Sequence, residues 1–170
     1  MVIRSRFLAA AAFIAVSAGG MAGYAHWASA KLPDTFSSLA GRWAGQGIVR
    51  PASGPAENFR CVVTYIPQGS SARMQQNLRC QSTNYRLDAA TQLELRGERV
   101  VGRWQENSFA GLTGTVHGVA KDGGFDVVLN GQFFQARMVI ATASKCEQSV
   151  RVVPARADYI REMSASLKKC

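Results

Sequence analysis

Hydrophobic and polar residues alternate along most of the chain after about residue 39, which is the pattern of half-buried β-strands. In the clearest run, residues 85–96, every second residue belongs to one mostly apolar face. That face carries Tyr85, Leu87, Ala89, Thr91, Leu93 and Leu95. Similar runs cover residues 59–65, 100–104, 112–116, 125–129 and 134–140, and no segment after residue 40 has a helical period. We therefore expect nine or ten strands between about residues 39 and 168.

Turn-forming residues separate the expected strands at short intervals. They gather at residues 51–55, 67–69, 96–97, 121–124 and 130–131. Asn130-Gly131 is the strongest hairpin signal among them, because both residues tolerate positive φ. Sequential strands with one apolar face each must close on themselves or pack as two sheets. The sequence thus predicts an all-β antiparallel up-and-down barrel of about 8–10 strands, with a β-sandwich as the alternative.

The first thirty residues have the pattern of a secretory signal peptide. Arg4 and Arg6 form a basic start, an apolar run covers residues 7–16, and small residues end the segment at Ala28-Ser29-Ala30. An uncleaved anchor over residues 7–25 is the alternative, because about 20 apolar residues can span a bilayer. We expect cleavage after Ala30, a periplasmic or secreted protein, and a single β-barrel domain over residues 31–170.

Cleavage leaves a basic chain. It removes Arg4 and Arg6 and no acidic residue, so the formal net charge falls from +9 to +7. A basic protein in the cell envelope suits an anionic envelope surface, although solubility alone also explains scattered charges. Nucleic acid is not an expected partner. Single-strand readers project aromatic side chains from a basic face, whereas the aromatic residues here follow the apolar rows.

The four cysteines, Cys61, Cys80, Cys146 and Cys170, all follow residue 30, and an oxidising compartment pairs such cysteines. Of three possible pairings we favour Cys61–Cys80 and Cys146–Cys170. Residues opposite each other on a hairpin have a constant index sum, and the midpoints of these pairs lie at turn residues near Gly69 and Asp158. A metal site is disfavoured, because no Cys-x-x-Cys spacing occurs and one histidine follows residue 30.

Residues suited to catalysis are few. His117 shares a polar row with Thr113 and Thr115, so we interpret it as an exposed strand residue. The carboxylates Glu94, Glu98 and Glu106 are expected on outer faces beside arginines, where solvated ion pairs form. The sequence therefore predicts no enzyme, no catalytic residue, no metal and no cofactor.

Gly41-x-Trp43 at the start of the first expected strand resembles the lipocalin and avidin class of small barrels, and Gly102-x-Trp104 repeats the unit. The resemblance implies that Trp43 closes the barrel end against a basic side chain from a late strand. Arg161 is the first choice for that side chain and Arg151 the second.

A wider set of residues resembles a group of small, uncharacterised exported proteins of alphaproteobacteria. The set is Leu39, Gly41-Arg42-Trp43, Cys61, Arg79-Cys80, Tyr85-Arg86 and residues 149–152. This resemblance implies localisation and a lipocalin-like or avidin-like barrel, and no activity. Cys170 has no place in its pattern.

Two functions remain open. The first is a carrier of a small apolar or amphiphilic ligand, for which small inward residues leave room: Ala89, Gly102, Gly114, Gly118, Ala136 and Ala165. The second is a protein-interaction module, because exported metalloprotease inhibitors are similar in having an N-terminal arm, here Lys31–Ser38, before a Leu-x-Gly-x-Trp strand. An interior cavity above about 300 Å³ favours the carrier, and a filled barrel favours the module.

Overall fold

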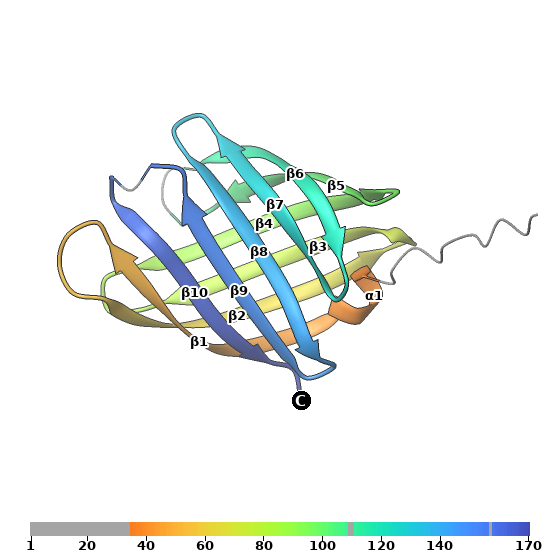
Figure 1. The fold of residues 1–170 in the computed structure, drawn as a ribbon, viewed down its shortest axis with the longest axis horizontal. Coiled ribbons are helices and arrows are strands. Elements are labelled where there is room, and N and C mark those ends of the chain that lie inside the picture. The colour runs from red at the N-terminus through yellow and green to blue at the C-terminus, as the bar shows by residue number, and fades with distance from the viewer. Residues whose placement is uncertain (1–34, 109–110, 157) are drawn as a thin grey trace, which may run out of the picture. The chain divides into compact units, whose positions relative to one another are not determined.

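The computed structural model describes residues 35–108, 111–156 and 158–170, which form one short helix and ten strands (Figure 1). The expected signal peptide, residues 1–30, and residues 31–34 of the expected arm lie outside the described residues. The elements are α1 (Thr35–Leu39), β1 (Gly41–Pro51), β2 (Glu57–Gln68), β3 (Ser70–Gln81), β4 (Arg86–Arg96), β5 (Arg99–Glu106), β6 (Thr113–Lys121), β7 (Gly124–Gly131), β8 (Gln135–Ser144), β9 (Glu147–Pro154) and β10 (Ile160–Lys168).

The strands form a closed antiparallel barrel in chain order. Each strand pairs with its neighbours in sequence, and β10 pairs back onto β1, with Ala44 opposite Lys168 and Arg50 opposite Glu162. Closure removes the unpaired sheet edges that a sandwich would leave. The predicted up-and-down barrel is therefore confirmed, and the sandwich alternative is discarded.

The two ends of the barrel differ in how they are covered. We call the end with the turns β2–β3, β4–β5, β6–β7 and β8–β9 the closed end, because α1 lies there (Figure 1). Phe36 and Leu39 of α1 are buried in the core, and the Thr35 hydroxyl donates to the Lys121 carbonyl at 3.4 Å. The opposite end, with the longer connections β1–β2, β3–β4, β5–β6, β7–β8 and β9–β10, is the open end.

Large side chains fill the half of the interior next to the closed end. The buried residues there include Trp43, Tyr65, Met74, Leu93, Val100, Phe125 and Ile140. The Trp43 indole donates to the Leu39 carbonyl at 2.7 Å, which ties the first strand to α1. This half is a packed core of the kind that small barrels need to be stable.

A row of residues opposite one another shows how strongly the strands tilt. It runs across seven strands through Gly41, Tyr65, Gln76, Thr91, Trp104, Gly114 and Gly131. The row starts at the closed end of β1 and finishes at the open end of β7. Such a stagger is what closing a sheet into a barrel requires. As a result, Tyr65 lies in the half next to the closed end, whereas Trp104, further along the same row, lies in the open half.

The structure joins Cys61 to Cys80 and Cys146 to Cys170, the two pairs expected from the sequence. Cys61 and Cys80 are opposite each other on β2 and β3, with Cα atoms 4.1 Å apart. Cys146 lies in the β8–β9 turn and Cys170 follows β10, so the second bridge lies at the closed end.

The basic side chain on Trp43 is Lys169, not Arg161 or Arg151 as expected. β10 runs antiparallel to β1, so the residues level with the start of β1 are at the end of β10. Arg161 lies at the other end of β10, next to the residues that pair with Arg50 and Pro51. Arg151 instead bonds Glu162 on the outer surface, with Nε 2.8 Å from Oε1.

Candidate ligand-binding cavity

The open half of the barrel contains a cavity of about 310 Å³. Its wall is formed by inward side chains of β1–β5 and β7–β10 and by the connections at the open end. Aliphatic lining residues include Val49, Leu78, Leu87, Leu129, Val150, Val152 and Ile160. The volume is at the lower end of the range for small-molecule sites. It also exceeds about 300 Å³, the volume above which we expect a carrier rather than an interaction module.

The small inward residues named from the sequence make room in two different ways. Ala89 and Ala165 line the cavity directly. Gly114 instead lets the Trp104 ring approach the β6 backbone, because a Cβ atom at Gly114 would lie 2.5 Å from the Trp104 Nε1. Gly47 does the same for Phe59, whose ring would lie 2.5 Å from a Cβ there. The glycines thus place aromatic rings in the wall.

Trp104 and Phe134 form an aromatic wall near the open end. Their ring centroids are 6.0 Å apart in an edge-to-face arrangement at 76°. The Trp104 indole also donates to the Asn130 carbonyl at 3.2 Å, which satisfies its polar atom and fixes the ring. A pair of this geometry contributes about 0.5–1.5 kcal/mol beyond burial. The wall is therefore rigid on this side.

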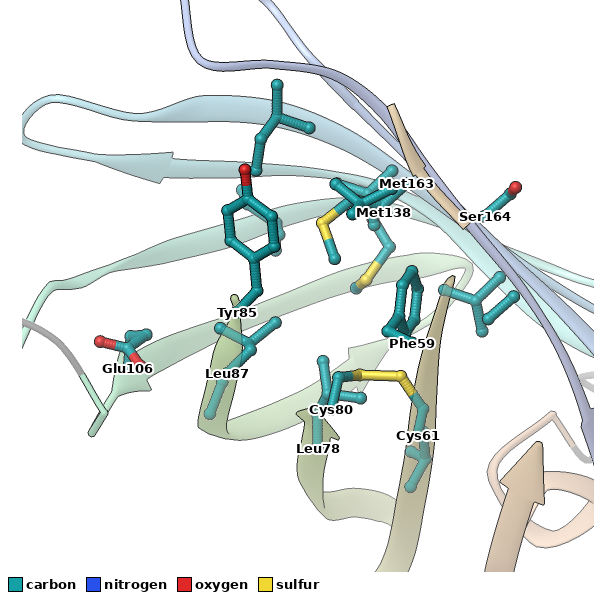
Figure 2. Close-up of a pocket in the computed structure, with 18 of the residues that line it drawn as sticks. Phe59, Cys61, Leu78, Cys80, Tyr85, Leu87, Glu106, Met138, Met163 and Ser164 are labelled. Carbon is teal, nitrogen blue, oxygen red and sulfur yellow. A yellow bond between two sulfur atoms is a disulfide. The ribbon is translucent and has the colours of Figure 1, made fainter. Parts of the chain in front are cut away.

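Sulfur atoms line another part of the cavity. Figure 2 shows the side chains of Met138, Met163 and Phe59 in the cavity, with the Cys61–Cys80 disulfide joining β2, the strand of Phe59, to β3. Methionine side chains are flexible and polarisable, and they pack well against aromatic rings. This part of the wall can adapt to the shape of an occupant.

Three buried polar side chains interrupt the apolar lining: Gln76, Thr91 and Glu106. Glu106 was expected on an outer face, and this expectation is wrong: it lines the cavity and is 6% exposed. The backbone N–H of Ser108 donates to its carboxylate at 2.6 Å, and the Ser108 hydroxyl donates to it as well. Glu106 is separated from the inward residues Val100 and Trp104 by even numbers of positions, so it lies on the same face of β5. The sequence analysis did not use this signal.

Below Gln76, a hydrogen bond crosses the packed half of the barrel. The Tyr65 hydroxyl on β2 donates to Oε1 of Gln148 on β9 at 3.1 Å. Burial raises the pKa of Tyr65 far above its ordinary value, so the phenol stays protonated and remains a donor. Within the described part of the chain, two buried side-chain atoms have no hydrogen-bond partner: Oε1 of Gln76 and Nε2 of Gln148.

Hydrogen bonds order the connections around the mouth of the cavity. The Glu57 carboxylate accepts from the backbone N–H of Asn84 at 3.0 Å and from its side chain at 3.2 Å. The Ser108 hydroxyl oxygen accepts from the Asp88 N–H at 3.0 Å and lies 3.1 Å from the Arg86 carbonyl oxygen. The mouth is therefore a shaped opening in which neighbouring connections support one another.

Large apolar side chains surround this mouth on its solvent side. Phe133 is 83% exposed and Tyr159 is 86% exposed, and both lie in open-end connections. Tyr85, in the β3–β4 connection, lines the cavity and is also exposed. An apolar molecule entering the barrel would meet these residues first.

The described residues offer little other chemistry. Among residues 35–108, 111–156 and 158–170, no group of three or more His, Cys, Asp or Glu side chains could hold a metal ion. His117 lies on the outer surface, with Nδ1 3.1 Å from Nδ2 of Asn130. No helix in the described part of the chain is long and apolar enough to cross a membrane.

Comparison with known proteins identifies the fold. No family model matches the chain, and no curated protein matches its sequence. The barrel is similar to the S-type phycobiliprotein lyase CPES from Guillardia theta, with a TM-score of 0.55 and 12% identity over 79% of this chain and 89% of that chain. It is also similar to EF1p2_mFAP2b bound to DFHBI, with a TM-score of 0.52 and 8% identity over 82% and 99% of the two chains.

Proposed function

We propose that this protein is an exported, non-enzymatic carrier that holds a small, mainly apolar molecule inside its barrel. The observation that carries the proposal is the cavity of about 310 Å³, walled by aromatic, aliphatic and sulfur-containing side chains and next to a solidly packed closed end. A barrel needs no such space for stability, since ten-stranded closure and the packed half already bury a core. Of the two similar structures, one is a phycobiliprotein lyase and the other is a barrel bound to the small molecule DFHBI.

The remaining parts of the proposal follow from the sequence. Residues 1–30 direct export and are cleaved after Ala30, which leaves residues 31–170 as one barrel domain in the periplasm or outside the cell. The two disulfides suit an oxidising compartment. The carrier needs no metal or cofactor, and its partner is its ligand.

The charge distribution favours a neutral ligand over an anionic envelope component inside the barrel. Arg86 is the one basic side chain among the described lining residues, and it is exposed at the mouth. An anion placed deeper would lose its hydration without gaining a counter-charge, which is strongly unfavourable. Anionic envelope surfaces would meet the basic outer face instead.

Native mass spectrometry of the protein purified from its own cell envelope tests the proposal, followed by extraction and identification of the bound compound. A binding assay with the fluorescent probe N-phenyl-1-naphthylamine gives a second test. Ala89→Leu and Ala165→Leu should fill the cavity and abolish probe binding. Ala141→Leu is the matched control, because Ala141 is exposed on the outer face of β8. Equal binding by all three variants would contradict the carrier.

A protein-interaction module is the second candidate, and the exposed side chains of Phe133 and Tyr159 favour it. The described part of the expected arm, residues 35–38, is instead packed as α1 onto the barrel, with Phe36 buried. Phe133→Ser with Tyr159→Ser separates the candidates. A carrier would keep its equilibrium affinity for the probe, whereas a module would lose capture of its partner protein.

A further inference from the structure

Exposed apolar side chains gather at the open end of the barrel, on four separate connections. Phe133 in β7–β8 and Tyr159 in β9–β10 are almost fully exposed, and Tyr85 in β3–β4 and Leu112 in β5–β6 are exposed to a smaller extent. We call these four side chains the rim. All four connections lie at the end of the barrel away from α1 (Figure 1).

The rest of the described surface has few such side chains. The other exposed large apolar residues among those described are Ile66 on β2 and Val119 on β6, each on a strand near its closed end. Single exposed apolar residues are common on folded proteins, whereas several gathered in one place mark a contact surface. The rim therefore identifies the open end as a surface that a partner covers.

The exposed charges beside the rim are mostly positive. Four exposed arginines lie there, and none forms an ion pair within the part of the chain that the structure describes: Arg60, Arg86, Arg156 and Arg161. In the described open-end connections the exposed acidic side chain is Asp158. The acidic residues of the adjoining strands are less exposed and already accept hydrogen bonds, namely Glu57, Asp88, Glu106 and Glu162. An anionic surface is the complementary one.

A lipid surface suits this arrangement better than a protein does. Aromatic side chains are favoured at the boundary between water and acyl chains. A stable protein interface buries roughly 800 Å² on each partner in a well-packed patch, whereas the rim surrounds the mouth of a cavity. Tyr85 belongs to both the rim and the cavity wall, so apolar surface continues from one to the other.

We infer that the open end docks onto an anionic phospholipid surface, with Phe133 and Tyr159 entering the interfacial layer and the neighbouring arginines meeting lipid phosphates. The anchoring side chains are few, so docking is reversible, as it is for other weak anchors. A docked barrel receives its apolar ligand from the acyl layer through the mouth, without exposing it to water. This loading step rests on the proposed carrier function, whereas docking does not.

Co-sedimentation of the exported protein with vesicles tests docking. Wild type should bind vesicles of phosphatidylcholine with an equal amount of phosphatidylglycerol more strongly than phosphatidylcholine alone, and salt should reduce this difference. Phe133→Ser with Tyr159→Ser should weaken partitioning onto the mixed vesicles roughly tenfold or more, because two rings leave the interface. Ile66→Ser with Val119→Ser is the matched control and should bind as wild type does.

A second pair of variants tests the charges. Arg156→Gln with Arg161→Gln should weaken partitioning onto the mixed vesicles roughly tenfold, with little effect on phosphatidylcholine alone. Arg42→Gln with Arg99→Gln removes the same charge from the closed end, where both side chains are exposed, and should bind nearly as wild type does. Thermal unfolding checks that each variant is folded.

Transfer of N-phenyl-1-naphthylamine from the mixed vesicles to the protein tests loading. For wild type the transfer rate should rise with vesicle concentration, because the docked protein collects the probe. For Phe133→Ser with Tyr159→Ser the rate should become independent of vesicle concentration, since escape of the probe into water then limits it. The equilibrium affinity should stay unchanged, because neither residue lines the cavity.

The outcomes separate docking from the carrier function. If wild type does not bind the mixed vesicles, or if the closed-end arginine variant loses as much binding as the open-end one, the inference is wrong and the carrier function stands. A purified envelope protein that binds wild type through Phe133 and Tyr159, with no vesicle binding, would assign the rim to a protein partner instead. If wild type binds vesicles through the rim but takes up no probe, docking stands and the carrier function fails.

Discussion

The Nζ atom of Lys169 lies 5.3 Å from the centroid of the Trp43 ring, so a residue just after the last strand covers the tryptophan that begins the first. Trp43 is completely buried, and its indole N–H is bonded to Leu39. The contact therefore joins α1, β1 and the end of β10 at the closed end. A cation over an indole face stabilises by about 0.5–2 kcal/mol, depending on how far it is desolvated.

Replacing the two partners of this contact should have unequal effects. Lys169→Met keeps the length of the side chain and removes the charge, so we expect a loss of about 0.5–1 kcal/mol in the free energy of unfolding. Trp43→Ala empties a fully buried site and should cost about 3–5 kcal/mol. Denaturant unfolding measures both. Similar losses for the two variants would show that Lys169 does more than cover the ring.

The two disulfides should separate stability from binding. Replacing both cysteines of either pair by alanine should lower the free energy of unfolding by about 3 kcal/mol, because each bridge closes a loop of comparable length. Only the Cys61–Cys80 pair lines the cavity. We expect its removal to change the affinity for N-phenyl-1-naphthylamine severalfold. The variant without Cys146 and Cys170 should bind the probe as wild type does. If both variants changed the probe affinity by a similar factor, the cavity would not lie where we place it.

Gly114 should be intolerant of a side chain because of the Asn130 backbone and the Trp104 ring. A Cβ atom at Gly114 would lie 1.8 Å from the Asn130 carbonyl oxygen and 2.5 Å from the Trp104 Nε1. Gly114→Ala should therefore displace the ring, cost about 1–3 kcal/mol as overpacking does, and weaken probe binding. Trp104→Phe in the same chain should recover part of the loss in a double-mutant cycle. Strict additivity of the two changes would mean that the ring does not depend on Gly114.

Acid should weaken an ion pair on the outer surface. The hydrogen bond from Arg137 lowers the pKa of Asp126, with the nearby charges of Arg137 and Lys121 acting in the same direction. A lowered pKa in the folded state stabilises the fold at pH values above the ordinary aspartate pKa, and this stabilisation is lost as the pH falls through the lowered value. Both groups are near solvent, so the effect should be small and should shrink in high salt.

Asp126→Asn isolates this contribution. The variant should unfold at a lower temperature than wild type at neutral pH, and the difference should disappear at low pH. Asp122→Asn, in the β6–β7 turn, is the matched control. A difference between wild type and Asp126→Asn that persists unchanged into acid would mean that the lost stability comes from packing rather than charge.

Alternation and turn chemistry were sufficient to predict the barrel, because each strand buries one face and the period is two. They could not predict which basic side chain meets Trp43, since that depends on where β10 begins and on its register with β1. With Lys168 opposite Ala44, Arg161 is carried to the far end of the barrel.

The sequence was sufficient to predict that a barrel with small inward residues could enclose an apolar cavity. It was not sufficient to predict where along the barrel that cavity lies. Strand tilt moves Trp104 to the open half, so the residues that meet around the space come from different heights along their strands. Glu106 was expected on an outer face because acidic residues beside arginines form solvated ion pairs, although it has the same parity as the inward residues Val100 and Trp104. The Ser108 backbone and hydroxyl make its burial possible, and neither bond is visible in the alternation pattern.

The Cys146–Cys170 bridge also determines how the barrel bears mechanical load. β9 and β10 lie between the bridged cysteines, so tension applied at the C-terminus passes through the disulfide directly to the β8–β9 turn. The 24-residue separation, roughly 3.4 Å per residue when extended, keeps about 80 Å of chain out of the force path. Stretching the oxidised protein would unravel β1–β8 except for the loop that Cys61–Cys80 closes, while the terminal hairpin stays slack, and reduction would release both hidden lengths.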